Sequence, residues 1–386
     1  MLAQFNIPST VIVGGGARHQ LVPQLQRLAA RRALLVTDAF MVKSGVAGAM
    51  QEELTKAGIE TALFADVQPD PTVQNVMDGL AALNRCGADV VVAVGGGSPM
   101  DAAKAIAVLA TNPPPLAQYA GYHKIPRAGV PLVLIPTTAG TGSEVTKVAV
   151  ITDTERDVKM MILDAHLLPR VALVDYELSL TMPAALTAHV GVDTLTHGIE
   201  AYVSRKAGAL TDPLALACVR LVAEHLRTAF REPGNHAARE AMMTAACLGG
   251  MAFANSSVCL VHGMSRPVGA HFHVAHGWSN AVLLPEVTRY SVPGAVGRYA
   301  TVARTVDAAT EKDSDATAAH ALVDYLEQLN LDLAVGRLRD AVKVDAATFE
   351  SKLPAMAEAA LASGSPQNNP VVPTPEDIIA LYRRAW

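Results

Sequence analysis

Aromatic residues and cysteines are scarce in this chain of 386 residues, and both shortages are informative. Aromatics make up only 4% of the sequence, so its cores must consist mostly of Ala, Val, Leu, Ile and Met. The four cysteines contain no CxxC pair, which argues against a disulfide framework. We therefore expect a cytoplasmic protein with free thiols.

Basic tracts and long apolar runs are also missing. With a net charge of −5 and no Lys/Arg cluster, the chain lacks the electrostatic footprint of a nucleic-acid-binding protein. Apolar segments such as 88–94 and 130–135 are far shorter than the ~20 residues that a membrane-spanning helix needs. The segment Met1–Pro8 does not read as a signal peptide. We expect neither nucleic acid nor membrane as a partner.

Apolar residues make up 51% of the chain, which is enough to form the cores of two domains. In residues 1–180, short β-branched runs alternate with helix-like segments, which predicts a Rossmann-like α/β domain with a parallel sheet covered on both faces. The expected strands are 10–13, 33–36, 60–64, 89–94, 131–135 and 171–174. The expected helices between them include 44–56, 73–86 and 99–110.

After about residue 180 the pattern changes, and apolar residues recur at helical spacing. The sequence predicts an all-α, helical-bundle domain over residues 181–386. Its expected helices include 183–203, 213–230, 237–254, 295–306, 316–329 and 375–384, with a loop at 363–374 before the last of them.

The sharpest motif of the first half is Gly95-Gly96-Gly97-Ser98, which follows a buried strand and opens a helix. Glycines let a phosphate approach the backbone, and a helix N-terminus offers free N–H groups. Ser98 can cap this helix or donate to a phosphate, and Pro99 suits the first helical position. The motif is neither the GxGxxG fingerprint nor a Walker loop, so a tight turn without a ligand stays open.

Two further features support a nucleotide site. Asp38 ends a strand, where an acidic side chain binds the ribose hydroxyls of NAD and repels the extra phosphate of NADP; a helix N-cap is the alternative. The loop 136–144, rich in Thr and Gly, can wrap a cofactor with hydroxyl donors or can be an ordinary polar turn. Gly14-Gly15-Gly16 also follows a strand, and we interpret it as a turn near the cofactor's edge.

In the second half, Asp193 and His197 are four residues apart, so on a helix both side chains leave the same face. This is a usual way to present two ligands to one metal ion. A charged i,i+4 pair or a buried histidine with a structural partner is the commoner explanation for an isolated Asp-x-x-x-His.

A histidine cluster in 256–280 strengthens the metal hypothesis, because neutral imidazole is the commonest nitrogen ligand. On one continuous helix, His262 and His276 would be ~21 Å apart, too far for two ligands of one ion. The chain must therefore turn back between them, and Pro267 and Gly269 are the expected break.

Taken in order, these motifs resemble the iron-containing (group III) alcohol dehydrogenases over essentially the whole chain. The matching residues are Gly95–Ser98 with Asp101 and Lys104, the loop 136–144, Asp193 with His197, and His262 with His276, Gly277 and Asn280. The resemblance implies an iron alcohol dehydrogenase or dehydroquinate synthase-like fold, with the active site in the cleft between the two domains. It also implies an NAD-dependent alcohol dehydrogenase or aldehyde reductase that forms a homodimer or larger homo-oligomer.

Carried over position by position, the resemblance implies a set of site residues. The metal ligands and catalytic centre would be Asp193, His197, His262 and His276, with Fe²⁺ implied by the family, and with Zn²⁺ or Mn²⁺ compatible with the same ligands. The NAD-binding residues would be Asp38, Gly95, Gly96, Gly97, Ser98, Thr137, Thr138, Lys159 and Leu178.

Arg266 departs from the family pattern, in which a histidine often stands four residues after the third ligand. A guanidinium stays protonated and cannot relay a proton. We expect Arg266 either to bind an anionic group on the substrate or to form a salt bridge at the cleft. His273, with His271, is a candidate for substrate contact or proton relay, or an ordinary cleft residue.

Two rival functions are also compatible with the sequence. A glycerol dehydrogenase-like or dehydroquinate synthase-like enzyme would keep the fold, although such enzymes usually rely on three protein ligands. A non-catalytic nucleotide-binding protein would account for the first half of the chain but not for the four metal positions of the second.

Overall fold

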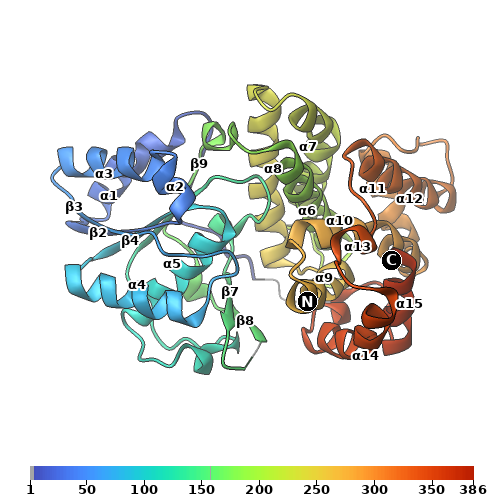
Figure 1. Cartoon of the computed structure of the whole chain (residues 1–386). Helices are drawn as coiled ribbons and strands as arrows, with labels where there is room; N and C mark the ends of the chain where they lie inside the picture. The colour runs from blue at the N-terminus through green and yellow to red at the C-terminus, as the bar shows by residue number, and fades with distance from the viewer. Residues whose placement is uncertain (1–3, 157) are drawn as a thin grey trace. The chain divides into compact units, whose positions relative to one another are not determined.

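The computed structural model describes residues 4–156 and 158–386. Two compact units divide the chain: Asn6–Leu180 forms one, and Thr181–Trp386 with Gln4 and Phe5 forms the other. Figure 1 shows the strands gathered in the first unit and the long helices in the second. Met1–Ala3, with which the expected first domain begins, lie outside the described residues.

A six-stranded parallel sheet is the centre of the first unit. Its strands run in the order β1-β9-β6-β4-β2-β3, and each neighbouring pair is parallel. The carboxyl ends of all six strands therefore lie at one edge, which is where α/β sheets bind their ligands. The bounds are β1 (Thr10–Val13), β2 (Arg32–Val36), β3 (Glu60–Phe64), β4 (Val90–Gly95), β6 (Leu132–Pro136) and β9 (Val171–Val174).

Side chains alternate between the two faces of this sheet, and each face has its own core. In β4, Val91 and Ala93 pack into one cluster, whereas Val90, Val92 and Val94 pack into the other. The first cluster lies under α4 (Val73–Cys86) and α5 (Gly97–Leu109). The second lies under α1 (Leu21–Arg27), α2 (Ala39–Lys43) and α3 (Val46–Lys56), as Figure 1 illustrates for α1 and α3. The two covered faces confirm the predicted α/β class.

A small three-stranded sheet was not anticipated from the sequence. It consists of β5 (Gly121–Tyr122), β8 (Val158–Leu163) and β7 (Val148–Asp153), in that order, with β7 and β8 antiparallel. Along β7, buried residues alternate with partly exposed ones, so only one face contributes to the core. Such a half-buried strand carries a weaker apolar signal than the fully buried strands of the main sheet.

The described residues of the second unit form helices and turns, which confirms the predicted all-α part of the fold. Its α-helices are α6 (Ala184–Val203), α7 (Asp212–Arg231), α8 (His236–Asn255), α9 (Leu260–Phe272), α10 (His276–Ser291), α11 (Val296–Thr305), α12 (Asp315–Asp332), α13 (Leu338–Ala341), α14 (Ala346–Ala362) and α15 (Pro375–Ala385). Helix α6 packs against α7, α8 and α10, and its residues 191–203 are all buried. Polar side chains on this part of α6 must therefore find partners inside the protein.

No single helix in the described part of the chain is long and apolar enough to cross a membrane. The pair α8 and α9, bent by 102°, passes the same test only when the two helices are taken together.

Candidate metal and nucleotide sites

Helix α6 carries the first two candidate ligands on one face. Asp193 and His197 are 3% and 4% exposed, and 3.9 Å separates Asp193 Oδ1 from His197 Nε2. The His197 ring stacks on Phe253 of α8, with ring centroids 4.4 Å apart. The i,i+4 spacing therefore brings the two side chains together as expected, and packing fixes the imidazole plane.

The other two candidate ligands come from the first turns of two later helices. His262 Nε2 lies 3.5 Å and His276 Nε2 lies 3.9 Å from Asp193 Oδ1. The rings of His197 and His262 stack with centroids 4.7 Å apart. Asp193, His262 and His276 each offer a ligand atom within 4.8 Å of the others. All four predicted ligand residues thus converge around one carboxylate oxygen.

The chain does turn back between His262 and His276, but not where the sequence predicted. Pro267 and Gly269 both lie inside α9, which continues to Phe272. The break falls at His273, whose left-handed backbone (φ 55°) ends α9 three residues before α10 begins. A proline removes one helical hydrogen bond, and here the helix tolerates that loss.

Exposure differs among the four residues. The side chains of Asp193, His197 and His262 are 4–6% exposed, whereas that of His276 is 46% exposed. Three of the four side chains are therefore buried, and the cluster is accessible beside His276. An open position next to protein ligands is what distinguishes a catalytic metal site from a structural one.

Electrostatics favour an ionised carboxylate at the centre of this cluster. Burial opposes ionisation of Asp193, but the neighbouring imidazoles outweigh it and lower the pKa of the carboxyl. Burial also opposes protonation of His262, yet the carboxylates of Glu200 and Asp193 raise its pKa to about 9. The pKa of His276 is lowered, first by loss of hydration and then by the surrounding positive groups.

The donor set and one orphaned atom fit a bound cation. The Nδ2 of Asn280 lies 2.6 Å from Asp193 Oδ1, 3.3 Å from His262 Nε2 and 3.2 Å from His276 Nε2. Positive amide hydrogens thus point at the atoms that would hold a metal. The other amide atom, Asn280 Oδ1, is buried without a hydrogen-bond partner among the described residues. One carboxylate with three imidazoles suits Fe²⁺, Zn²⁺ or Mn²⁺.

Two residues near the ligands were missed by the sequence analysis. Glu200 Oε2 lies 2.7 Å from His262 Nδ1, and Ser265 Oγ lies 3.0 Å from His276 Nδ1. The spacing of Glu200, seven residues after Asp193 on the same helix, was a usable signal. The contact of Ser265 depends on how α9 packs on α10, which no local pattern reveals.

The two predicted substrate residues lie on and just after α9. Arg266, four residues after His262, donates from Nη1 to Ser365 Oγ at 3.0 Å. Its charge is close enough to His276 to contribute to the lowered pKa of that ring. His273 is exposed at the break between α9 and α10, and His271 is exposed in the last turn of α9.

In the first unit, the glycine-rich turn joins β4 to α5. Gly95 has φ 150°, and a Cβ there would lie 2.7 Å from Pro99 Cγ, so only glycine fits. The helix begins at Gly97 with Gly96 as its N-cap and without a capping side chain in this described segment. Of the two roles considered for Ser98, capping is therefore wrong, and so is the expected place of Pro99 at the first helical position. Ser98 and Pro99 are the second and third residues of α5, because Gly96 adopts the cap conformation.

Asp38 and the hydroxyl-rich loop both lie close to this turn. Asp38 Oδ1 accepts a hydrogen bond from Met41 N at 2.9 Å, so the residue does cap α2. Its Oδ2 lies 3.5 Å from the position of a Cβ on Gly95. The corresponding Cβ positions of Gly96 and Gly97 lie 3.7 and 3.0 Å from side-chain atoms of Thr138 and Thr141. Asp38 and Thr138, two of the predicted nucleotide residues, thus lie beside this turn.

A buried lysine holds the hydroxyl-rich loop in place. Lys104 is 0% exposed, and its Nζ donates to Ser143 Oγ (2.7 Å), Thr146 Oγ1 (3.0 Å) and Val148 O (2.7 Å). Ser143 Oγ in turn donates to Asp101 Oδ1 at 2.7 Å. All three ammonium hydrogens are used, so Asp101 and Lys104 of the motif have a structural role.

The remaining predicted cofactor residues lie in two different parts of the first unit. Thr137 follows β6, and Leu178 follows β9, at the same sheet edge as the glycine-rich turn. Lys159 instead lies on β8 of the small sheet, where its Nζ pairs with Asp70 Oδ1 at 2.6 Å.

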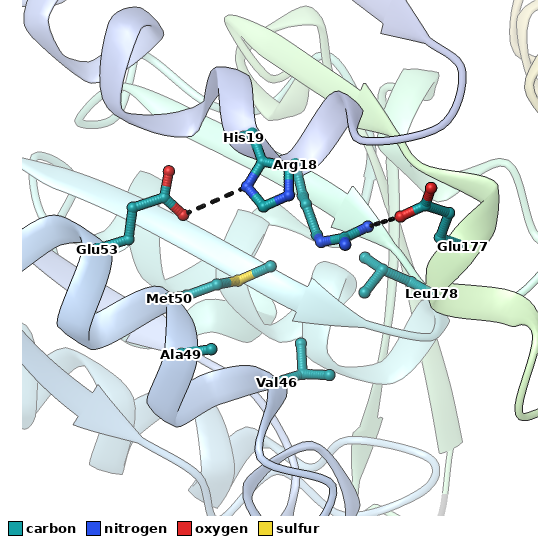
Figure 2. Close-up of a pocket in the computed structure, with 8 residues that line it drawn as sticks. All are labelled: Arg18, His19, Val46, Ala49, Met50, Glu53, Glu177 and Leu178. Carbon is teal, nitrogen blue, oxygen red and sulfur yellow. Dashed lines mark hydrogen bonds and ion pairs between the residues drawn. The ribbon is translucent and has the colours of Figure 1, made fainter.

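Leu178 also lines a cavity of about 190 Å³, shown in Figure 2. Apolar side chains of α3, including Val46 and Met50, face it from one side. From the other side comes Arg18, whose Nη1 pairs with Asp175 Oδ2 at 2.6 Å and Glu177 Oε2 at 2.7 Å.

Comparison with known proteins agrees with this geometry. Residues 8–176 match the family model for iron-containing alcohol dehydrogenase, and residues 187–386 match the C-terminal model of the same family. The lactaldehyde reductase of Escherichia coli K12 is 38% identical over 380 residues, covering 98% of each chain.

Two solved structures extend the likeness. A 1,3-propanediol oxidoreductase is 38% identical with a TM-score of 0.97, and the match covers 100% of both chains. The sulfoacetaldehyde reductase of Bifidobacterium kashiwanohense, solved with NAD⁺, is 28% identical with a TM-score of 0.88, over 100% of this chain and 99% of the other. This chain is therefore an oxidoreductase that belongs to the iron-containing alcohol dehydrogenase family.

Proposed function

We propose that the protein transfers a hydride between NAD(H) and a small alcohol or aldehyde, with a divalent metal ion held by Asp193, His197, His262 and His276. The convergence of three Nε2 atoms within 3.5–3.9 Å of Asp193 Oδ1 is the observation that carries the proposal. When bound, the ion supplies Lewis acidity toward the substrate oxygen, and the cofactor supplies or accepts the hydride.

The residues around the metal position have different roles in binding the ion and the substrate. Asp193 contributes the negative charge, and the three imidazoles contribute neutral lone pairs. The exposed side of His276 leaves room for the substrate oxygen. The family likeness favours Fe²⁺, while the donor set is equally suited to Zn²⁺ or Mn²⁺.

The cofactor would bind in the nucleotide domain, residues 1–180, and the metal in the helical domain, residues 181–386. The free N–H groups of Gly95–Ser98 would take the pyrophosphate, because α5 begins there. Asp38 Oδ2, which does not cap α2, would accept from the ribose hydroxyls and disfavour NADP. Thr137, Thr138 and Leu178 would line the site, with Lys159 at its margin.

The substrate would carry an anionic group that Arg266 binds. Arg266 lies one helical turn after His262, so both side chains leave the same face of α9. Arg266 Nη1 donates to Ser365 Oγ at 3.0 Å, and a guanidinium is suited to bind a carboxylate or sulfonate through two parallel N–H groups. The structural relative named sulfoacetaldehyde reductase supports this class of substrate. His273 is the second candidate for substrate contact.

Further features belong to the same proposal. The four cysteines are free thiols, which supports a cytoplasmic location. Family likeness supports a homodimer or larger homo-oligomer.

NADH absorbance with a panel of small alcohols and aldehydes tests the function. We expect turnover that chelation abolishes and Fe²⁺ or Zn²⁺ restores, and a higher kcat/KM for aldehydes with an acidic tail. Turnover that survives complete chelation, or no turnover with any member of the panel, would contradict the proposal.

A further inference from the structure

Glu200 is a buried carboxylate to which the proposed function assigns no role. It is 3% exposed on α6, and both of its oxygens accept hydrogen bonds. Oε1 accepts from Val261 N at 2.7 Å, and Oε2 accepts from Cys259 N at 2.8 Å. Oε2 also lies 2.7 Å from His262 Nδ1. All three partners belong to the start of α9, so one side chain of α6 holds the whole first turn of another helix.

The two backbone contacts make Glu200 the cap of α9. Cys259, the N-cap residue, provides no side-chain capping bond in this described segment, so the acceptor comes from α6 instead. A carboxylate at a helix N-terminus satisfies free N–H groups and is stabilised by the helix dipole. The position of His262, in the first turn of α9, therefore depends on Glu200.

The third contact decides which nitrogen of His262 faces the metal position. Glu200 accepts from Nδ1, so Nδ1 carries a hydrogen and Nε2 points toward Asp193. A histidine ligand bound through Nε2 requires this arrangement, and a carboxylate acceptor on the other nitrogen also makes the ring a stronger ligand.

Helix periodicity places these groups together. Asp193, His197 and Glu200 occupy positions i, i+4 and i+7 of α6, which share one face. That face thus carries two candidate ligands directly and fixes a third through Glu200. Two buried carboxylates, Asp193 and Glu200, also match the charge of a divalent ion.

We propose that Glu200 is a positioning residue for the metal centre, which sets the ring orientation and the Nδ1 hydrogen of His262 and completes the charge balance of the site. The proposal rests on the proposed function, because it presupposes a divalent ion at Asp193 and His262. It assigns Glu200 no contact with substrate or cofactor.

His276 offers an internal comparison, because its Nδ1 lies 3.0 Å from a neutral hydroxyl, Ser265 Oγ. Ser265 Oγ also lies 2.7 Å from Ser279 Oγ, which donates to His276 O at 2.9 Å. A hydroxyl acceptor stabilises a metal-bound imidazole less than a carboxylate does. Loss of Ser265 should therefore weaken metal binding less than loss of Glu200.

The test measures the Zn²⁺ dissociation constant of the full-length protein by competition with a chromogenic chelator. Glu200→Gln keeps an acceptor for one backbone N–H but presents an amide to His262, and we expect its dissociation constant to rise 10–100-fold. Ser265→Ala should raise it less than tenfold. Asp345→Ala, which removes a cap from α14, should lower the thermal midpoint and leave Zn²⁺ binding unchanged.

A wild-type measurement complements the variants in case Glu200→Gln does not fold. In the Zn²⁺ form with ¹⁵N-labelled histidine, the Hδ1 resonance of His262 should lie far downfield and be protected from solvent exchange. Absence of that resonance, or a Zn²⁺ constant for Glu200→Gln equal to the wild type's, would overturn the proposal. Failure of the wild type to bind Zn²⁺, Fe²⁺ and Mn²⁺ alike would instead overturn the proposed function.

Discussion

Gly277 lies so close to His189 that a Cβ on Gly277 would be 2.6 Å from the carbonyl oxygen of His189. His189 is on α6, four residues before Asp193, and Gly277 directly follows His276 in α10. Trp278 strengthens this contact by stacking on the His189 ring, with centroids 5.1 Å apart. The absence of a side chain at Gly277 is therefore what lets the start of α10 reach α6 beside the metal ligands.

Gly277→Ala should weaken metal binding. Overpacking of this kind costs roughly 1–3 kcal/mol, and here the strain would move the first turn of α10, which carries His276. We expect a lower thermal midpoint and an approximately tenfold higher Zn²⁺ dissociation constant, measured by chelator competition. Gly48→Ala in α3 is the matched control, since nothing lies within 4 Å of its Cβ position. It should be stabilising by up to about 1 kcal/mol and should not change Zn²⁺ binding.

Asp38→Asn should relax the choice of cofactor. Asparagine can still accept from Met41 N and cap α2, but it removes the charge that repels the 2′-phosphate of NADP. We expect the ratio of kcat/KM for NADPH to that for NADH to rise about tenfold or more, corresponding to about 1.4 kcal/mol. An unchanged ratio would remove Asp38 from the ribose site, while an unchanged thermal midpoint would show that the cap is kept.

Arg266→Ala should lower kcat/KM for aldehydes with a carboxylate or sulfonate tail by roughly 10–100-fold, since hydrogen bonds to charged groups contribute about 1.5–3 kcal/mol. Neutral aldehydes of the same length should change little. Ser365→Ala is the control, because it removes the partner of Arg266 and leaves the charge. If Arg266→Ala affected charged and neutral aldehydes equally, a structural role for the guanidinium would explain it better.

Because of Glu144, we expect the free energy of unfolding to fall as the pH rises. Burial raises the pKa of this carboxyl to about 7, against the partial opposition of its own backbone and of Lys104. The folded state therefore holds a proton that the unfolded state releases near pH 4.5, so stability is lost as pH rises from 4.5 to 7.

The size of this effect is of the order of 1–3 kcal/mol. Glu144→Gln should remove this pH dependence. The free energy of unfolding, measured with denaturant at pH 4.5 and pH 7, should therefore differ less between the two pH values for the variant than for the wild type. Equal differences would mean that Glu144 is ionised in the folded protein throughout this range. Keeping the pH below 7.5 limits the contribution of Lys104, whose pKa burial lowers to about 8.

The main sheet was predictable because its strands are buried on both faces. Val90–Gly95 is apolar throughout, so no alternative exposed register competes with it. The β7–β8 hairpin was missed because buried and partly exposed residues alternate along both strands, and Lys159 of β8 pairs with Asp70 outside the hairpin. Fully buried strands are thus recognisable locally, whereas half-exposed ones depend on tertiary contacts.

In the candidate site, too, some features could be predicted from local sequence and others depend on tertiary contacts. The spacing of Asp193 and His197 predicts that they face one point, and the structure brings them together. The need for a turn before His276 was also predictable from helix length, but its position at His273 was not, because a proline inside α9 is tolerated by its surroundings. The spacing of Glu200 from Asp193 places it on the ligand face of α6, but its contact with His262 depends on where α9 packs, which no local pattern encodes.

Metal content of the purified protein tests the central claim most directly. We predict about one equivalent of Fe²⁺, Zn²⁺ or Mn²⁺ per chain in the wild type after mild chelator washing, measured by inductively coupled plasma mass spectrometry. Asp193→Ala and His262→Ala should retain almost none, because each removes a buried ligand from a four-residue set. A full equivalent retained by both variants would contradict the metal site proposed for Asp193, His197, His262 and His276.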